Sequence, residues 1–288
     1  MMTAKVISPE ELFEQLDDPQ LRILDATAIL QRDFDGGPYE VISGRFAFDE
    51  LHIPGAVFAD VPGELSDVDA PFPFALPTPE HFAQAMGALG VGEGTRVVTY
   101  AQQSPMWATR LWWLLRYFGF DDVLVLDGGL LGWLEAELPV SSEPSSYPAT
   151  TFNAKVRPEL VATKDDVLSV LDGAPACLVN ALPTKAFVGD GPGAYSRPGR
   201  IPGSVSVPSV GLLASTTGPF RANEELKPLL ADIVAAANER PIIAYCGGGI
   251  SATVDIFALS LLGHDDVKLY DGSLTEWSAD PALPLEVG

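Results

Sequence analysis

Cysteine and histidine are scarce in this sequence. Its 288 residues include two cysteines, Cys177 and Cys246, and three histidines, His52, His81 and His264. Two distant thiols do not make the dense disulfide framework of a small secreted domain, so reduced thiols and a cytoplasmic location are expected. The histidines are scattered along the chain, so no metal site is expected.

Positive charge is also in short supply. Lysine and arginine number 17 against 39 aspartates and glutamates, which gives a formal net charge of −22 and a pI near 4.3. A nucleic-acid-binding protein needs a cationic surface, so no nucleic-acid partner is expected. An anionic substrate would meet long-range repulsion, so a site for one must supply local positive potential.

Long hydrophobic runs are absent. The most apolar long stretch, 241–263, is interrupted by glycines and by Asp255, so no membrane partner is expected. Residues 1–10 lack the apolar core of a signal peptide. With 47% hydrophobic and 19% charged residues, the composition is that of a folded globular chain.

An internal repeat organises the sequence. Five segments of the first half recur in the same order in the second, three of them at an offset of 144 or 145 residues. A period of this length equals one domain, which predicts a tandem pair: a first domain at 1–140, a Ser/Pro/Thr-rich linker at 141–153, and a second domain at 154–288. The matched segments are 24–26 with 179–181, 52–57 with 200–205, 97–100 with 242–245, 119–123 with 263–267, and 126–133 with 270–277.

Strand-like and helix-like patterns alternate in each half, which predicts the α/β class with mainly parallel sheets flanked by helices. In such sheets, ligands bind beyond the carboxyl ends of the strands. Strands are expected at 21–26, 95–100, 123–126, 241–245 and 267–270, and helices at 79–89, 108–118, 223–238 and 252–262.

One strand end carries the pattern of a reactive site. The expected strand 241–245 is followed by Cys246, three glycines and an expected helix. Backbone N–H groups of a glycine loop and a helix N-terminus attract anions, and the same field favours a thiolate, the nucleophilic form of cysteine. The alternative is an inert buried cysteine beside a tight turn. The expected anion cradle comprises Gly247, Gly248, Gly249, Ile250, Ser251 and Ala252.

The first half lacks this site. Its equivalent loop, 101–106, reads A-Q-Q-S-P-M and has neither cysteine nor glycine. One copy is therefore expected to be catalytic, while the other is structural and lends surface to the active-site cleft.

The chain resembles the tandem-domain rhodanese family of thiosulfate and 3-mercaptopyruvate sulfurtransferases. The resemblance covers nearly all of it and is carried by H-I-P-G-A at 52–56, R-I-P-G-S at 200–204, L-D-G-G at 126–129 and the Cys246 loop. C-G-G-G-I-S is closer to the mercaptopyruvate type than to the thiosulfate type of loop. The resemblance implies that Cys246 takes sulfur from a small anionic donor as a persulfide. It also implies transfer to a thiol, cyanide or protein acceptor, without a metal or organic cofactor.

Several family positions are altered. The arginines usual in the second domain are replaced by Leu182 and Ala186, which leaves Lys185, Arg197 and Arg200 as the candidate donor-binding cations. The serine, histidine and aspartate that the family's mercaptopyruvate enzymes use fall at or near three residues of other types, Gly248, Phe74 and Pro62.

Two other functions remain open from the sequence. The missing arginines are compatible with a non-catalytic module that binds sulfur or senses oxidants at Cys246. A cysteine phosphatase is disfavoured, because Ala252 stands where such an enzyme has the arginine that binds the phosphate dianion. Steady turnover with a small sulfur donor separates an enzyme from a binding module.

Overall fold

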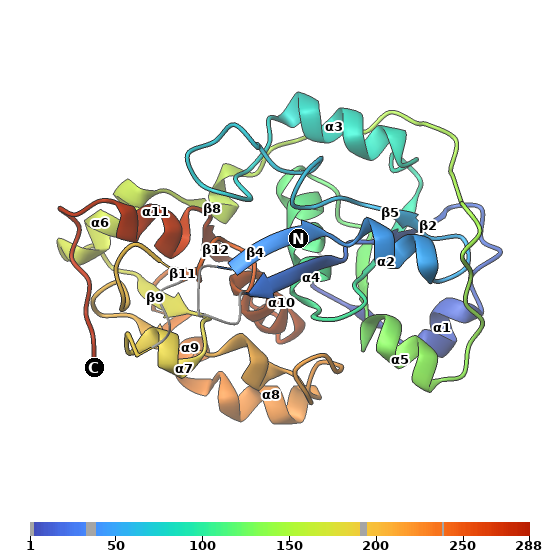
Figure 1. Ribbon diagram of the computed structural model, residues 1–288. Helices are drawn as coiled ribbons and strands as arrows, with labels where there is room; N and C mark the ends of the chain where they lie inside the picture. The colour runs from blue at the N-terminus through green and yellow to red at the C-terminus, as the bar shows by residue number, and fades with distance from the viewer. Residues whose placement is uncertain (1–2, 33–38, 191–194, 238) are drawn as a thin grey trace.

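The structure is a computed structural model that describes residues 3–32, 39–190, 195–237 and 239–288. Two domains lie side by side, each built around its own five-stranded parallel sheet (Figure 1). The expected class, two α/β domains with parallel sheets flanked by helices, is confirmed.

The two sheets have the same strand order. From edge to edge the first runs β1 (Val6–Ile7), β7 (Val123–Leu126), β6 (Arg96–Tyr100), β2 (Leu21–Asp25) and β5 (Val57–Phe58). In the same direction the second runs β8 (Val161–Ala162), β12 (Val267–Tyr270), β11 (Ile242–Tyr245), β9 (Cys177–Asn180) and β10 (Val205–Ser206). The sequence repeat is therefore a structural repeat, with β11 the counterpart of β6 at the centre of its sheet. A hairpin of β3 (Ala28–Arg32) and β4 (Tyr39–Ser43) has no counterpart in the second domain among the described residues.

Helices cover the sheets. In the first domain they are α1 (Pro9–Phe13), α2 (Arg45–Glu50), α3 (Pro79–Ala88), α4 (Met106–Tyr117) and α5 (Gly129–Glu135). In the second they are α6 (Lys164–Leu171), α7 (Thr184–Phe187), α8 (Asn223–Leu229), α9 (Ala231–Ala237), α10 (Ala252–Leu261) and α11 (Ser273–Ala279), with short 3₁₀ turns at Pro158–Leu160 and Ser209–Leu212. In the part of the chain that the structure describes, no helix is long and apolar enough to cross a bilayer.

The helix predicted from the sequence at 223–238 was wrong in one respect. A single helix was expected over 223–238, but the chain forms α8 and α9, which are separated at Leu230. Pro228 near the end of α8 lacks an N–H group and crowds the preceding turn, so it disfavours one continuous helix. Asn238, the last residue of that prediction, lies outside the described residues.

The domain interface is close to symmetric about α4 and α10. Thr109 on α4 and Thr253 on α10, which are equivalent in the repeat, share a hydrogen bond of 2.8 Å between their hydroxyl groups. The Asp127 carboxylate accepts from the N–H of Phe220 at 2.9 Å, and the equivalent Asp271 accepts from the N–H of Leu76 at 3.0 Å. Each domain thus anchors a loop of the other in the same way.

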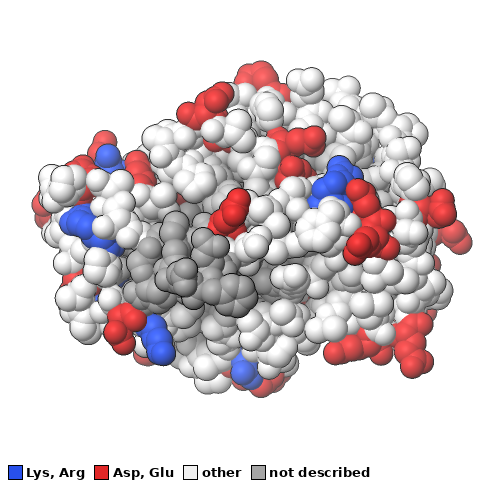
Figure 2. Space-filling view, viewed as in Figure 1, with Lys and Arg blue, Asp and Glu red and all other residues white. Residues whose placement is uncertain are grey.

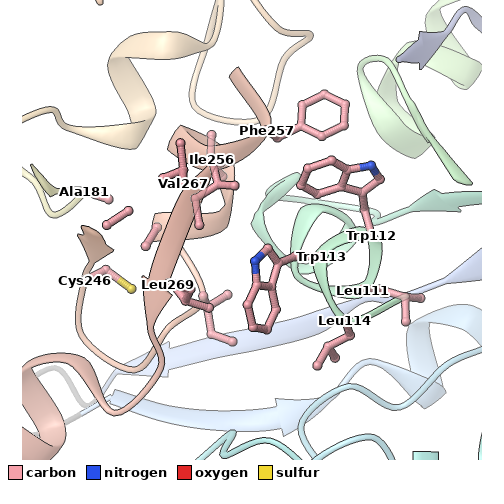
Figure 3. Close-up of a cluster of buried hydrophobic side chains, with 14 of the residues drawn as sticks. Leu111, Trp112, Trp113, Leu114, Ala181, Cys246, Ile256, Phe257, Val267 and Leu269 are labelled. Carbon is pink, nitrogen blue, oxygen red and sulfur yellow. The ribbon is translucent and has the colours of Figure 1, made fainter. Parts of the chain in front are cut away.

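Aromatic side chains fill the space between these helices. The Trp112 ring on α4 packs edge-on against Phe257 on α10, with 4.8 Å between the ring centres, and Trp113 lies one residue further along α4 (Figure 3). Cys246 belongs to the same hydrophobic cluster. The tryptophans of this helix are therefore packing residues, as their helical spacing predicts.

Asp255 is a buried carboxyl group within this apolar region. Neither oxygen has a hydrogen-bond partner among the described residues, and burial raises the pKa of Asp255 well above its usual value. The folded protein therefore keeps this proton at pH values where the unfolded chain has lost it. The stability contributed at this position falls as the pH rises above about 4 toward the folded-state pKa.

Replacing this carboxyl group with an apolar side chain is expected to stabilise the protein. Asp255→Val should raise the free energy of unfolding at pH 7 by about 1–3 kcal/mol, because it removes an unsatisfied polar group. The gain should shrink toward pH 4. Urea unfolding of both proteins at several pH values measures this gain in the free energy of unfolding. A gain that does not change with pH would contradict a raised pKa of Asp255.

Candidate functional site

Cys246 lies at the carboxyl end of β11, the central strand of the second sheet, and the residue is 2% exposed. Figure 3 shows its side chain at the edge of the apolar cluster, near Ala181, whose N–H donates to the carbonyl of Tyr245 at 3.0 Å. The loop 247–251 follows, and α10 begins at Ala252. The structure thus has the expected strand–cysteine–glycine–helix order, which places a thiol next to the amino end of a ten-residue helix.

The loop backbone presents donors without acceptors. The N–H groups of Cys246 and Gly249 donate to the Ser273 hydroxyl at 3.1 and 3.2 Å. The other N–H groups of the expected cradle have no acceptor among the described residues; they belong to Gly247, Gly248, Ile250, Ser251 and Ala252. Buried backbone donors are rarely left unpaired, so a cluster of five favours an anionic group as their acceptor.

Each loop glycine meets a different steric demand. A Cβ atom at Gly247 would lie 2.1 Å from the Tyr195 hydroxyl, and one at Gly248 would lie 3.3 Å from the Phe74 ring. Gly249 has φ +74°, a conformation that other residues rarely adopt. Gly247 and Gly248 therefore leave room for Tyr195 from the same domain and for Phe74 from the first domain to lie close to the loop.

Ser273 stabilises the loop through its hydroxyl group but adopts an unfavourable backbone conformation. Its φ is +50°, in the left-handed region, where the first domain has Gly129 at +54°. The Ser273 hydroxyl accepts the two loop N–H groups and donates to the Tyr270 carbonyl at 2.8 Å. The sequence analysis missed this residue, although the change from D-G-G in the first copy to D-G-S in the second signals it.

Two substitutions separate the strain at Ser273 from its hydrogen bonds. Ser273→Ala should lower the free energy of unfolding by about 1–3 kcal/mol, because two buried N–H groups lose their acceptor. Ser273→Gly loses the same bonds but relieves the left-handed backbone, so it should cost about 1 kcal/mol less. Urea unfolding of the three proteins gives these values, and a glycine variant less stable than the alanine variant would refute the strain argument.

A buried ion pair from the domain interface supports the same loop. The Arg110 guanidinium on α4 is fully buried and donates to the Asp271 carboxylate at 2.6 Å, to the Gly249 carbonyl at 3.3 Å and to the Phe74 carbonyl at 2.6 Å. The sequence analysis missed both Arg110 and Asp271. The signal was an arginine inside the apolar pattern of an expected helix.

The candidate donor-binding arginines have other partners. Arg197 donates to four backbone carbonyls between residues 277 and 283, at 2.6 to 3.4 Å. Arg200 pairs with Glu286 at 3.0 Å and donates to the carbonyls of Phe187 and Gly288. Both guanidinium groups thus hold the C-terminal segment. Lys185 is exposed on α7, and donor binding by all three cations stays a prediction.

Two of the three positions at which the serine, histidine and aspartate are replaced lie close together in the structure. A Cβ atom at Gly248 would lie 3.3 Å from the Phe74 ring, so an aromatic ring stands where the resemblance implies an imidazole. Phe74 packs edge-on against Trp107, with 5.5 Å between the ring centres. The loop therefore lies under an aromatic side chain that the first domain supplies, which supports the expected role of that domain at the cleft.

The second cysteine differs from Cys246 in its surroundings. Cys177 lies within β9, is buried, and burial raises the pKa of its thiol. A thiol held in the protonated form is a poor nucleophile. Among the described residues, no group of three or more His, Cys, Asp or Glu side chains is arranged to hold a metal ion.

The chain is similar to a known domain family and to several characterised proteins. The model of the rhodanese-like domain matches residues 8–136 and 188–280. The chain is 36% identical to the 3-mercaptopyruvate sulfurtransferase of Escherichia coli K12, over 99% of both chains, and 33% identical to the thiosulfate sulfurtransferase of Gallus gallus, over 89% of this chain and 86% of that one. The crystal structure of SseA from Escherichia coli, a 3-mercaptopyruvate sulfotransferase with the rhodanese fold, superposes with a TM-score of 0.83 at 34% identity, over 94% of this chain and 99% of SseA.

Proposed function

Because the chain belongs to the rhodanese family and is a sulfurtransferase, we propose that it takes sulfane sulfur from thiosulfate or 3-mercaptopyruvate onto Cys246 and passes it to a thiol, cyanide or protein acceptor. The observation that carries the proposal is the cysteine at the end of β11, next to five loop N–H groups that lack an acceptor in the described structure.

The proposed domains are 1–140 and 154–288, joined by 141–153, and the proposed location is the cytoplasm.

The first half-reaction forms the persulfide. The Cys246 thiolate attacks the outer sulfur of the donor, an S–S bond forms, and the donor leaves without that sulfur. The negative charge then lies on the terminal sulfur of Cys246, and the loop N–H groups stabilise it. The helix dipole of α10 acts on the same charge.

The second half-reaction returns the free thiolate. A nucleophilic acceptor attacks the terminal sulfur, and the electrons of the S–S bond return to Cys246. On the face drawn in Figure 2, acidic side chains outnumber cationic ones, in keeping with the net charge of −22. Such a negative surface raises the local concentration of a positively charged protein acceptor.

Steady-state kinetics test the proposal. With cyanide as acceptor, thiocyanate should form, and double-reciprocal plots at several acceptor concentrations should be parallel, because the donor's product leaves before the acceptor binds. Sulfite or pyruvate release identifies the donor that is used. Intersecting plots would exclude a persulfide that outlives donor release, and no turnover with either donor would refute the proposed donors.

A further inference from the structure

The loop around Cys246 reaches the surface at two positions. Of residues 246–252, Gly248 and Ser251 are partly exposed and the others are buried, with Cys246 itself 2% exposed. A nucleophile that attacks a sulfur atom carried by Cys246 is therefore expected to approach past Gly248 or Ser251.

The first domain borders both of these positions with an apolar side chain. A Cβ atom at Gly248 would lie 3.3 Å from the Phe74 ring, and the Ser251 hydroxyl donates to the Met106 sulfur at 3.7 Å. Phe74 and Met106 are themselves partly exposed, so an approaching molecule can touch them. These two side chains are called the apolar rim below.

Phe74 is held beside the loop against the preference of its own backbone. Its φ is +63°, in the left-handed region that a bulky residue rarely adopts. The Arg110 guanidinium donates to the Phe74 carbonyl at 2.6 Å, and the Asp271 carboxylate accepts from the Leu76 N–H at 3.0 Å. Strained conformations persist only where the surroundings enforce them, and they cluster at functional sites. The buried ion pair therefore places the Phe74 ring at the loop for more than packing alone.

Charge and apolar surface favour the same kind of acceptor at this rim. The net charge of −22 repels an anionic acceptor at long range, whereas an alkanethiol is uncharged in solution at neutral pH. A hydrocarbon chain next to the attacking sulfur would also cover Phe74 and Met106 and remove apolar surface from water, which is favourable.

We propose that the preferred acceptor is a thiol whose sulfur is flanked by hydrocarbon, with Phe74 as the specificity-determining residue; this inference rests on the proposed function. The proton of the thiol passes to the terminal sulfur of the Cys246 persulfide, and the thiol's own sulfur attacks that atom. A new S–S bond forms, the S–S bond to Cys246 breaks, and its electron pair returns to Cys246 as the thiolate. The acceptor leaves as an alkyl persulfide.

The acceptor step can be measured by itself. The protein is loaded with sulfur from either donor, freed of that donor, and mixed with ethanethiol, 1-propanethiol or 1-butanethiol. The loss of the loaded sulfur from the intact mass gives a rate constant for each thiol. Full burial of a methylene group corresponds to about a fourfold gain, so a partly open rim should give about twofold per methylene. Rate constants that do not rise with chain length would overturn the proposal.

Two substitutions at Phe74 test whether this residue sets the preference. Phe74→Asn should fold, because asparagine adopts the left-handed region more readily than most residues, and it should lose most of the chain-length dependence. Phe74→Leu keeps an apolar side chain and should retain most of the dependence. Phe46→Ala is the matched control, since it removes an exposed phenyl ring of α2 outside the rim, and it should change nothing. An unaltered dependence in Phe74→Asn would overturn the role of Phe74.

Failure of the proposed function looks different from failure of this inference. A protein that takes no sulfur from either donor, or that keeps it in the presence of cyanide and all three thiols, would refute sulfur transfer itself. A protein that gives its sulfur to cyanide, and to the three thiols at equal rates, would refute only the preference for hydrocarbon next to the sulfur.

Discussion

Cys246→Ser is expected to abolish sulfur transfer with every donor. A serine hydroxyl is a far weaker nucleophile than a thiolate at neutral pH, and serine cannot carry sulfane sulfur as a persulfide. The fold should survive, because the substitution changes one buried atom and keeps the hydrogen bond from the Leu274 N–H to the carbonyl of residue 246. Thiocyanate formation measures the loss.

Cys177→Ala is the matched control for this change. It removes the other thiol of the chain, whose pKa burial raises, and should leave the transfer rate close to that of the unaltered protein. Residual transfer in Cys246→Ser that disappears in the double variant would show that Cys177 carries sulfur, and would contradict the assignment of the nucleophile.

Asp271→Asn is expected to produce the largest loss of stability. It leaves the fully buried Arg110 guanidinium without its counter-charge, and breaking a buried ion pair on one side costs about 3–5 kcal/mol. Arg110 also holds the carbonyls of Gly249 and Phe74, so the transfer rate should fall with the stability. Urea unfolding and thiocyanate formation measure the two effects.

The repeat supplies the control for this ion pair. Asp127 is the counterpart of Asp271 and also accepts a backbone N–H from the opposite domain, but Val254 stands where its arginine partner would be. Asp127→Asn should therefore cost only about 1 kcal/mol, the value of an ordinary hydrogen bond. Similar losses in the two variants would show that the Arg110–Asp271 charge pair contributes little.

The sequence was sufficient for the fold and for the place of the candidate nucleophile. Periodicity predicted β7, β12, α4 and α10 to within two residues at each end, because these elements are buried and their apolar spacing is strong. The order of the repeated segments predicted the two domains. The strand–cysteine–glycine order predicted the loop at the end of β11.

The contacts around the loop could not be predicted in the same way. Gly247 and Gly248 were interpreted as members of an anion cradle, whereas a Cβ atom at these positions would also crowd Tyr195 and Phe74, respectively. Those contacts join residues 52 or more positions apart, and no local pattern encodes them. For the same reason, the partners of Arg197 and Arg200 in the C-terminal segment were not anticipated.

The most direct test of the account is to locate the transferred sulfur. The unaltered protein is incubated briefly with thiosulfate or 3-mercaptopyruvate, and its intact mass and peptide masses are then measured. The account predicts a gain of one sulfur atom, confined to the peptide that contains Cys246 and removed by cyanide. A gain on the Cys177 peptide, or no gain while thiocyanate is still produced, would contradict it.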